Sequence, residues 1–277
     1  MNRTAIVIPI YKDFESLDIY EHVSLTQLER KFSQHDVFFI TYPELDSTKY
    51  SLKFENKAKV ITFDKLFFES IAGYNRLLMQ VAFYKAFSEY EYLLICQLDV
   101  FVFSDMLEHF TQLGYDYIGA PWFESFGSTT NDNKILGVGN GGFSLRKVSS
   151  VLRILDFFEA FKKPLLSVAR AKALAQEPVP LLKTLKHERI RRKHGYPSIL
   201  PWQHHDNEDI YWSMYIPPFF PWYKVSTVED AMAFAFETRP ELLYTLNNNK
   251  LPMGVHAWQK YNPEFWKPYI ERLGYTL

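Results

Sequence analysis

Short apolar runs alternate with amphipathic segments through the first part of the chain. Runs rich in β-branched and aromatic residues predict strands at 5–10, 36–41, 59–63 and 92–103. Segments with apolar residues at helical spacing predict helices at 16–32, 67–87 and 105–113. Strands that alternate with helices in this way are typical of a doubly wound α/β sheet.

The second part of the chain continues this pattern with more interruptions. A predicted strand at 115–122 ends at Pro121, and the polar residues 124–134 predict a loop. Further elements are a predicted helix at 148–161, a strand at 224–227, a helix at 228–236 and a strand-like run at 253–258. We expect one α/β domain over residues 1–277, with a helical insertion at 162–200.

One carboxylate interrupts the longest apolar run. The stretch from Leu93 to Cys96 predicts a buried central strand, and it leads into Asp99 before the chain becomes apolar again. A charge near the end of such a strand is costly unless it has a partner. Ligands of open α/β sheets bind at the carboxyl ends of the strands, so Asp99 is a candidate binding residue. The alternative is a helix cap, although Ser104 and Asp105 already supply one.

Residues 137–142 hold four glycines in six positions, and an apolar-alternating run follows them. Such a turn lets the backbone come very close to a ligand. It differs from the dinucleotide-binding fingerprint, which needs a strand before the glycines and a helix that opens on them. A tight bend within a strand is the alternative interpretation.

The densest group of polar side chains lies between Pro201 and Trp212. Its members are His204, His205, Asp206, Asn207, Glu208 and Asp209. The His-x-x-x-His spacing of a helical metal site is absent. We therefore expect Asn207 near a helix N-cap, with one carboxylate that points into a cleft as a base. Acidic residues that stabilise the dipole of a first helical turn are the alternative. A lone histidine in an apolar run, such as His256, is more often structural than a ligand.

Composition narrows the classes of protein that the chain fits. With 277 residues, 47% of them hydrophobic, the chain can bury a sizeable core. The formal net charge of −1 predicts no general affinity for nucleic acid. The only cysteine, Cys96, is expected to be a small buried hydrophobe, which is compatible with a reducing compartment. Because the sequence shows neither a signal peptide nor an apolar stretch of spanning length, we expect a cytoplasmic protein.

Residues 162–194 are strongly basic. Ten lysines and arginines stand against two glutamates there, a local excess of eight positive charges, and leucines interleave with them. A basic amphipathic segment predicts contact with an anionic membrane surface, at the inner face of the membrane for a cytoplasmic protein. A solvated helical insertion is the alternative, and Pro178 and Pro180 predict two shorter helices rather than one.

Six motifs in order resemble the DUF5672 family of bacterial glycosyltransferases, and more widely the GT-A fold of fringe-like and core-1 galactosyltransferase-type enzymes. They are Tyr74-Asn-Arg-Leu-Leu78, Gln97-Leu-Asp-Val-Phe101, Tyr117-Ile-Gly-Ala-Pro-Trp122, Gly139-Asn-Gly-Gly-Phe-Ser-Leu-Arg146, Asn207-Glu-Asp-Ile-Tyr-Trp212 and Gly254-Val-His-Ala-Trp258. The resemblance covers nearly the whole chain, apart from the basic segment. It implies a GT-A-like, Rossmann-type mixed sheet with helices on both faces.

The resemblance also implies how the donor is bound. Asp99 resembles the last Asp of the Asp-x-Asp motif, which holds a divalent metal on the donor diphosphate. Gln97 stands where that motif has its first Asp, so one carboxylate remains here for manganese or magnesium. His256 resembles the C-terminal histidine that completes the metal or diphosphate site, and Gly141 and Gly142 resemble the turn beside the donor sugar. The nucleotide of a UDP-sugar would lie near the end of the first strand; its candidate contacts are Pro9, Tyr11, Thr41 and Asn75.

The reaction implied is transfer of a sugar to a hydroxyl of a glycan or lipid-linked glycan, in bacterial surface polysaccharide synthesis. Glu208 and Asp209 resemble the pair in which the Asp deprotonates the acceptor, and a single base implies inversion at the anomeric carbon. Trp122, Trp202 and Trp212 offer stacking faces to an acceptor sugar, although all three equally fit a core. Two alternatives remain open: a metal-dependent phosphoesterase or nucleotidyltransferase, and a non-catalytic module that binds nucleotide sugars.

Overall fold

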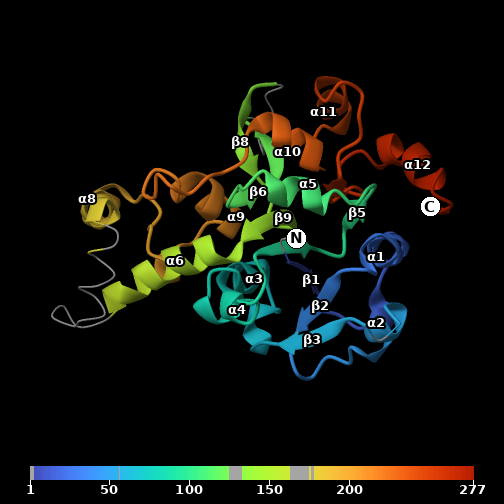
Figure 1. The fold of residues 1–277 in the computed structure, drawn as a ribbon, viewed down its shortest axis with the longest axis horizontal. Coiled ribbons are helices and arrows are strands. Elements are labelled where there is room, and N and C mark those ends of the chain that lie inside the picture. The colour runs from blue at the N-terminus through green and yellow to red at the C-terminus, as the bar shows by residue number, and fades with distance from the viewer. Residues whose placement is uncertain (1–2, 56, 125–132, 163–174, 176–177) are drawn as a thin grey trace.

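A mixed sheet forms the centre of the molecule (Figure 1). The structure is a computed structural model that describes residues 3–55, 57–124, 133–162, 175 and 178–277. The strands of this sheet, in spatial order, are β3 (Lys59–Thr62), β2 (Asp36–Thr41), β1 (Thr4–Pro9), β4 (Tyr92–Cys96), β9 (Phe143–Lys147) and β6 (Tyr117–Ile118). The first four run parallel, whereas β9 is antiparallel to both of its neighbours.

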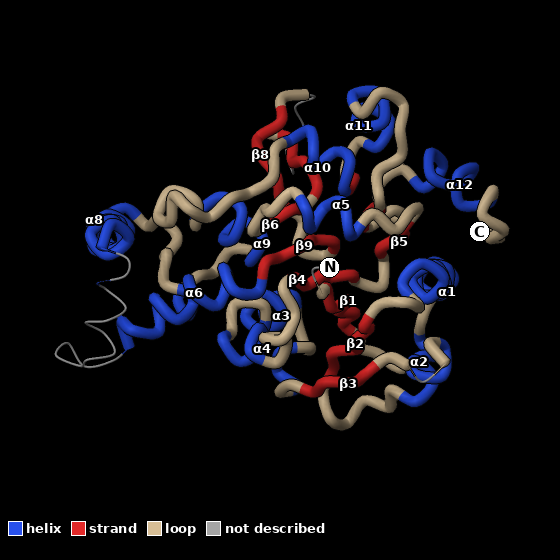
Figure 2. Tube along the Cα trace, viewed as in Figure 1, coloured by secondary structure: helices blue, strands red, loops and turns tan. Residues whose placement is uncertain are grey.

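Helices cover both faces of this sheet (Figure 2). They are α1 (Ile19–Phe32), α2 (Thr48–Lys53), α3 (Ile71–Leu77), α4 (Val81–Lys85), α5 (Leu107–Gln112), α6 (Val148–Glu159), α8 (Pro178–His194), α9 (Glu208–Ile210), α10 (Val228–Phe234), α11 (Pro240–Leu246) and α12 (Pro263–Glu271). Short 3-10 turns are η1 (Phe14–Ser16), η2 (Lys65–Phe67), η3 (Ala160–Lys162) and η4 (Pro201–Gln203), and η5 (Tyr211–Tyr215) is a π-helix.

Alternate residues of the central strands belong to two separate cores. Ile6 and Ile8 of β1 pack in the cluster that includes α1, α2 and α5. Ala5 and Val7 pack in the cluster that includes α3, α4 and α6. Because side chains alternate along a strand, a strand buried on both faces reads as a continuous apolar run. The expected α/β sheet with helices on both faces is therefore confirmed.

A second sheet of three strands stands beside the first. Its order is β10 (Ala235–Phe236), β11 (Gly254–His256) and β5 (Val100–Val102). A separate hairpin consists of β7 (Ala120–Phe123) and β8 (Ile135–Gly139). The chain leaves the large sheet at Cys96 and enters the small one at Val100, so residues 97–99 connect the two.

The structure differs from the sequence-based expectations at several elements. The strand expected at 92–103 is divided into β4 and β5, which belong to different sheets, and the helix expected at 228–236 ends at Phe234, where β10 follows. The single helix expected at 67–87 is divided, because Ser70 and Gln80 have extended backbones that begin α3 and α4 separately. The strand expected at 115–122 is also divided, and β7 continues through Pro121 because it pairs only with β8, on one side, in the described chain. In place of the strand expected at 224–227 there is a single bridge between Tyr117 and Val225.

The basic segment is described only at residues 162 and 175 and from α8 onward. Pro178 and Pro180 lie in the first turn of α8, where a proline is tolerated, so they begin this helix instead of dividing it. The expectation of a second helix falls on residues 163–174, 176 and 177, outside the described residues. Among the helices that the structure describes, none is both long and apolar enough to cross a bilayer.

Candidate active site

A cavity of about 820 Å³ opens at the carboxyl ends of β1 and β4. Its walls come from both sheets, from the β7–β8 hairpin, and from α3 and α9. The volume is that of a typical site for a small molecule or cofactor. It lies where ligands of open α/β sheets bind, as expected from the position of Asp99.

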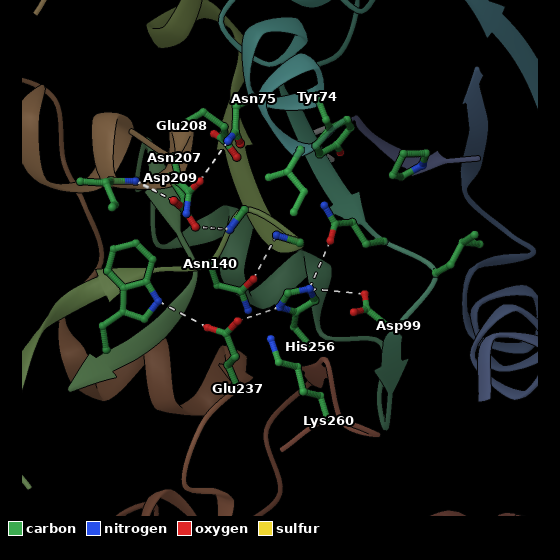
Figure 3. Close-up of a pocket in the computed structure, with 18 of the residues that line it drawn as sticks. Tyr74, Asn75, Asp99, Asn140, Asn207, Glu208, Asp209, Glu237, His256 and Lys260 are labelled. Atoms are coloured by element: carbon green, nitrogen blue, oxygen red, sulfur yellow. Dashed lines mark hydrogen bonds and ion pairs between the residues drawn. The ribbon is translucent and has the colours of Figure 1, made fainter. Parts of the chain in front are cut away.

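Most of the candidate residues chosen from the sequence line this one cavity. They are Pro9, Tyr11, Asn75, Gln97, Asp99, Trp122, Gly141, Gly142, Glu208, Asp209 and His256. The chain thus brings together side chains that lie more than 150 positions apart in sequence, such as Asp99 and His256. Figure 3 shows Asp209 and His256 on different walls of the same cavity.

Three candidates lie elsewhere, which corrects the sequence-based choice. Trp212 is fully buried in the core beside α4 and α6, and its indole N–H donates to the carbonyl of Leu78. Trp202 is on η4, with its ring below the ammonium of Lys162 rather than in the cavity wall. Thr41 is buried at the end of β2 and does not line the cavity.

The carboxylate of Asp209 is held by two backbone donors. Its Oδ2 accepts from the N–H of Gly141 at 2.8 Å, and its Oδ1 accepts from the N–H of Ile210 at 2.8 Å. Burial raises the pKa of Asp209, although these two donors act in the opposite direction. A fixed carboxylate with a raised pKa at a cavity wall has the properties of a general base.

Glu208 has a different role from its neighbour. Both of its oxygens bind the guanidinium of Arg146, at 2.8 and 2.9 Å, and both side chains are almost fully buried. Burial raises the pKa of Glu208 to about 7, while Arg146 opposes that shift. We assign the ionised state, because short bidentate contacts are typical of a carboxylate bound to arginine. Because its carboxylate is bound to a buried guanidinium and its side chain is only 2% exposed, Glu208 anchors the start of α9, and this anchoring role replaces the expectation that it takes part in catalysis.

The two adjacent glycines make room for side chains of the site. A Cβ at Gly141 would clash with the carboxylate of Glu208, and a Cβ at Gly142 would clash with the imidazole of His256. The sequence predicted that this turn lets the backbone approach a ligand. Both glycines do line the cavity, but the space next to each Cα is filled by a protein side chain.

His256 lies between two carboxylates (Figure 3). Its Nδ1 is 3.0 Å from Glu237 Oε1, and its Nε2 is 3.3 Å from Asp99 Oδ1 and 3.2 Å from Gln97 Oε1. Burial alone would lower the pKa of His256, but Asp99 and Glu237 outweigh it and raise that pKa to about 10. Burial likewise opposes the ionisation of Asp99, yet His256 lowers the pKa of that carboxyl overall. Asp99 and Glu237 therefore favour a positive charge at this position.

Sequence reasoning missed three residues of this region. Lys260 and Glu237 line the cavity beside His256, and Arg146 holds Glu208 from behind. Arg146 ends the motif that runs from Gly139, but the sequence suggests no separate role for this arginine. A single Lys or Glu in a polar stretch carries no pattern, so only the fold reveals Lys260 and Glu237.

Part of this cluster fits a divalent cation. Asp99 Oδ1 and His256 Nε2 are close enough to bind one ion, and the other nitrogen of His256 contacts a carboxylate, as in many metal-bound histidines. Among the described residues, no group of three or more His, Cys, Asp or Glu side chains is arranged to hold a metal. Any further protein ligand in the described chain must therefore be of another type.

Comparison with solved structures identifies similar folds. Mouse xyloside xylosyltransferase 1 in its apo form matches with a TM-score of 0.50 and 12% sequence identity, over 92% of this chain and 96% of that chain. At this identity the likeness establishes the fold alone, and it confirms the expected GT-A-like architecture.

Two other structures match with TM-scores of 0.47. One is a glycosyltransferase involved in the glycosylation of the major capsid of PBCV-1, at 14% identity over 97% of this chain and 99% of that chain. The other is the apo-form glycosyltransferase GlyE of Streptococcus pneumoniae TIGR4, at 12% identity over 97% of this chain and 60% of that chain.

Sequence comparison gives a family but no characterised relative. No curated protein matches the chain. The model of the family described as a protein of unknown function (DUF5672) matches residues 57–256, which include β4, the glycine turn, α9 and β11. The chain therefore belongs to the DUF5672 family.

Proposed function

We propose that the protein is a glycosyltransferase that moves a sugar from a nucleotide-sugar donor to a hydroxyl of an acceptor. The observation that carries this proposal is one cavity lined by the cluster of Asp99, His256 and Glu237 and, on another wall, by the half-buried carboxylate of Asp209. Glycosyl transfer needs both parts, a site that stabilises the leaving diphosphate and a base for the acceptor. The printed names of the structural neighbours describe glycosyltransferases, which agrees with this reading, although a shared fold does not imply a shared function.

The donor would lie along the carboxyl ends of β1 and β4. Pro9 and Tyr11 line that side of the cavity, next to the loop that carries Asp99. The ammonium of Lys260 and a divalent cation held by Asp99 and His256 would face the diphosphate. When bound, such a cation supplies positive charge to the leaving group. A UDP-sugar with manganese or magnesium remains our expectation for the donor.

Asp209 would act on the acceptor. It takes the proton of the acceptor hydroxyl as that oxygen bonds to the anomeric carbon. The bond from the carbon to the diphosphate oxygen breaks, and its electron pair leaves with the nucleoside diphosphate. One base and no covalent intermediate give inversion at the anomeric carbon. Glu208 and Arg146 fix the backbone that carries Asp209, so the base keeps its position during the reaction.

The acceptor wall is partly apolar. The side chains of Ile71 and Leu136 line the cavity and are 79% and 49% exposed, and Trp122 adds an aromatic face. Exposed apolar residues in a cavity wall are typical of a surface that binds an apolar or amphipathic partner. They support a glycan or lipid-linked glycan as the acceptor, as in bacterial surface polysaccharide synthesis.

A donor panel tests this function. Nucleotide release from UDP-, GDP- and CMP-sugars would be measured with manganese and with EDTA, for the wild type, for Asp209→Asn and for the control Asp206→Asn. Asp206 lies three residues earlier and binds the hydroxyl of Tyr215, so its substitution changes a carboxylate of the same segment outside the reaction. We expect the wild type to release nucleotide. Asp209→Asn should slow this rate by roughly 10²- to 10⁴-fold, whereas Asp206→Asn should leave it unchanged.

Three results would contradict the proposal. The first is a panel in which no nucleotide sugar protects the protein against thermal unfolding or releases its nucleotide. The second is hydrolysis of a phosphate ester without an acceptor, which would favour the phosphoesterase. The third is donor binding with no turnover in the wild type, which would favour the binding module.

We further propose that the outer face of α8 contacts an anionic membrane surface. Leu182 and Leu185 are exposed on this helix, together with basic side chains that include Lys186 and Arg189. Glu188, the only acidic residue of α8, is turned inward, where it accepts from the N–H of Ile199. The described outer face thus combines apolar and positive groups, which suits anionic lipid.

Co-sedimentation with vesicles tests this contact. The double substitution Lys186→Glu and Arg189→Glu should abolish binding to vesicles that contain phosphatidylglycerol. The same charge change at the exposed Lys85 and Lys250 should preserve most of the binding. Equal recovery of the wild type on neutral and anionic vesicles would overturn the proposal.

A further inference from the structure

Two side chains around His256 have no role in the function proposed above. Gln97 presents its Oε1 to Nε2 of His256 at 3.2 Å, and Glu237 presents its Oε1 to Nδ1 at 3.0 Å. Both residues line the cavity, and the side chain of Glu237 is only 10% exposed. Figure 3 shows Glu237 and Asp99 on opposite sides of the imidazole.

The small sheet determines this arrangement. Asp99 directly precedes β5, His256 is the last residue of β11, and Glu237 directly follows β10. Because β11 is antiparallel to β5 and parallel to β10, these three ends meet at one edge of the sheet. The carbonyl of Asp99 also accepts from the N–H of Ala257, which fixes the backbone there.

Gln97 is held from the other sheet. It directly follows β4, and its N–H donates to the carbonyl of Gly142 at 2.9 Å. Its carbonyl also accepts from the N–H of Val100 in β5 at 3.1 Å, so the backbone that carries this side chain is fixed to both sheets. The protein alone thus holds these side chains in place, and such preorganisation lowers the entropic cost of binding a ligand.

We infer that the amide oxygen of Gln97 completes a divalent-cation site with Asp99 and His256, and that Glu237 is the positioning residue of this site. The inference rests on the proposed function, because it specifies how the cation of that reaction is held. Nε2 of His256 is 3.2 and 3.3 Å from the two oxygens. Ligand atoms about 2.1 Å from one ion and at right angles to each other stand roughly 3 Å apart.

Glu237 supplies what a metal-binding histidine requires. A carboxylate at Nδ1 keeps the proton on that nitrogen and orients the ring, so the ion displaces the proton of Nε2 and binds there. The other oxygen of Glu237 accepts from the indole N–H of Trp122 at 3.4 Å. Glu237 thus joins the cation site to the wall assigned to the acceptor.

The ligand types indicate which ion fits. Magnesium and calcium bind almost entirely through oxygen, so the imidazole nitrogen makes manganese, a transition-metal ion that also accepts oxygen ligands, the ion to test first. An amide in place of a second carboxylate removes one negative charge from the site. We therefore expect manganese to bind weakly to the free protein and more tightly when a nucleoside diphosphate adds its own oxygens.

Electron paramagnetic resonance measures the affinity for manganese directly, since the signal of free manganese falls as the ion binds. The protein would be titrated with manganese alone and with UDP present. Glu237→Gln and Gln97→Leu should each weaken binding about tenfold or more, whereas Gln97→Asp should strengthen it. Glu69→Gln removes a carboxylate from another part of the cavity wall and should leave the affinity unchanged.

The outcome separates the inference from the proposed function. Unchanged affinity in both Glu237→Gln and Gln97→Leu, with unfolding temperatures like that of the wild type, would overturn the inference, even if nucleotide sugars bind. So would a wild type that binds no manganese with or without UDP. If manganese binds as expected but no nucleotide sugar does, the cation site holds and the transferase proposal fails.

Discussion

Two halves of the site lie next to adjacent glycines, but they differ in how their charged side chains are paired and buried. The base half, next to Gly141, consists of Arg146, Glu208 and Asp209. The cation half, next to Gly142, consists of Gln97, Asp99, Glu237 and His256. Arg146 is fully buried, while Asp99 keeps 28% of its side chain exposed.

The difference follows from what each half is proposed to do. In the base half, Arg146 and Glu208 pair with each other, so their ion pair can be sealed in the core and fixes the backbone that carries Asp209. In the cation half, Asp99 and Glu237 share one histidine, Lys260 lies beside them, and the side chain of Asp99 stays partly open to solvent. An ion pair buried in the core can fix the position of a backbone, whereas a charged cluster that reaches solvent can bind a ligand.

The largest expected effect is on stability and concerns the base half. Arg146→Met leaves the Glu208 carboxylate buried without its partner, which should lower the free energy of unfolding by about 3–5 kcal/mol. Chemical denaturation measures this cost. The double variant Arg146→Met with Glu208→Met should recover much of the loss, because no charge is then left in the core. If the loss of unfolding free energy in the double variant equals the sum of the losses in the two single variants, the two side chains do not act as a pair.

The adjacent glycines separate the two halves most sharply. Gly142→Ala pushes on His256 and should weaken manganese binding, whereas Gly141→Ala pushes on Glu208 and should slow transfer while manganese binding is kept. Overpacking of this kind costs about 1–3 kcal/mol, or roughly 5- to 150-fold in the affected step. Manganese titration and initial rates would be measured on both variants. If both lose the same property, the division into halves is wrong.

The pH dependence tests the base half with a smaller effect. Burial raises the pKa of Asp209, and Glu237 adds to that shift while Arg146 opposes it. Only the ionised carboxylate accepts a proton, so kcat should rise with pH through this raised pKa and then level off. Asp206→Asn should leave the profile in place. A kcat that falls as pH rises through this range would indicate an acid in place of a base.

Much of the site could be predicted from the sequence, because its residues occur in recognisable contexts. Asp99 interrupts an apolar strand, the glycine turn is dense, and Asp209 lies in a polar cluster at a helix start. The wrong choices, such as Trp212, concern the direction in which a side chain points. Trp212 follows Asp209 by three positions, and sequence spacing alone does not tell which face of a helical turn meets the cavity.

The residues that sequence reasoning missed depend on tertiary structure. Glu237 reaches His256 only because β10 and β11 pair in a particular register. The broken helix at 67–87 has a similar cause, since the apolar spacing continues while Ser70 and Gln80 adopt extended backbones. Pairing between distant segments and the conformation of single residues are not encoded in a local periodic pattern.

The most direct test of the account is calorimetric titration of UDP with manganese into the wild type, Asp99→Asn and Asp209→Asn. The account predicts that the wild type and Asp209→Asn bind UDP with similar affinity, and that Asp99→Asn loses most of it, because only the cation half holds the diphosphate. Equal affinity in all three proteins, or no binding of UDP to the wild type, would contradict it.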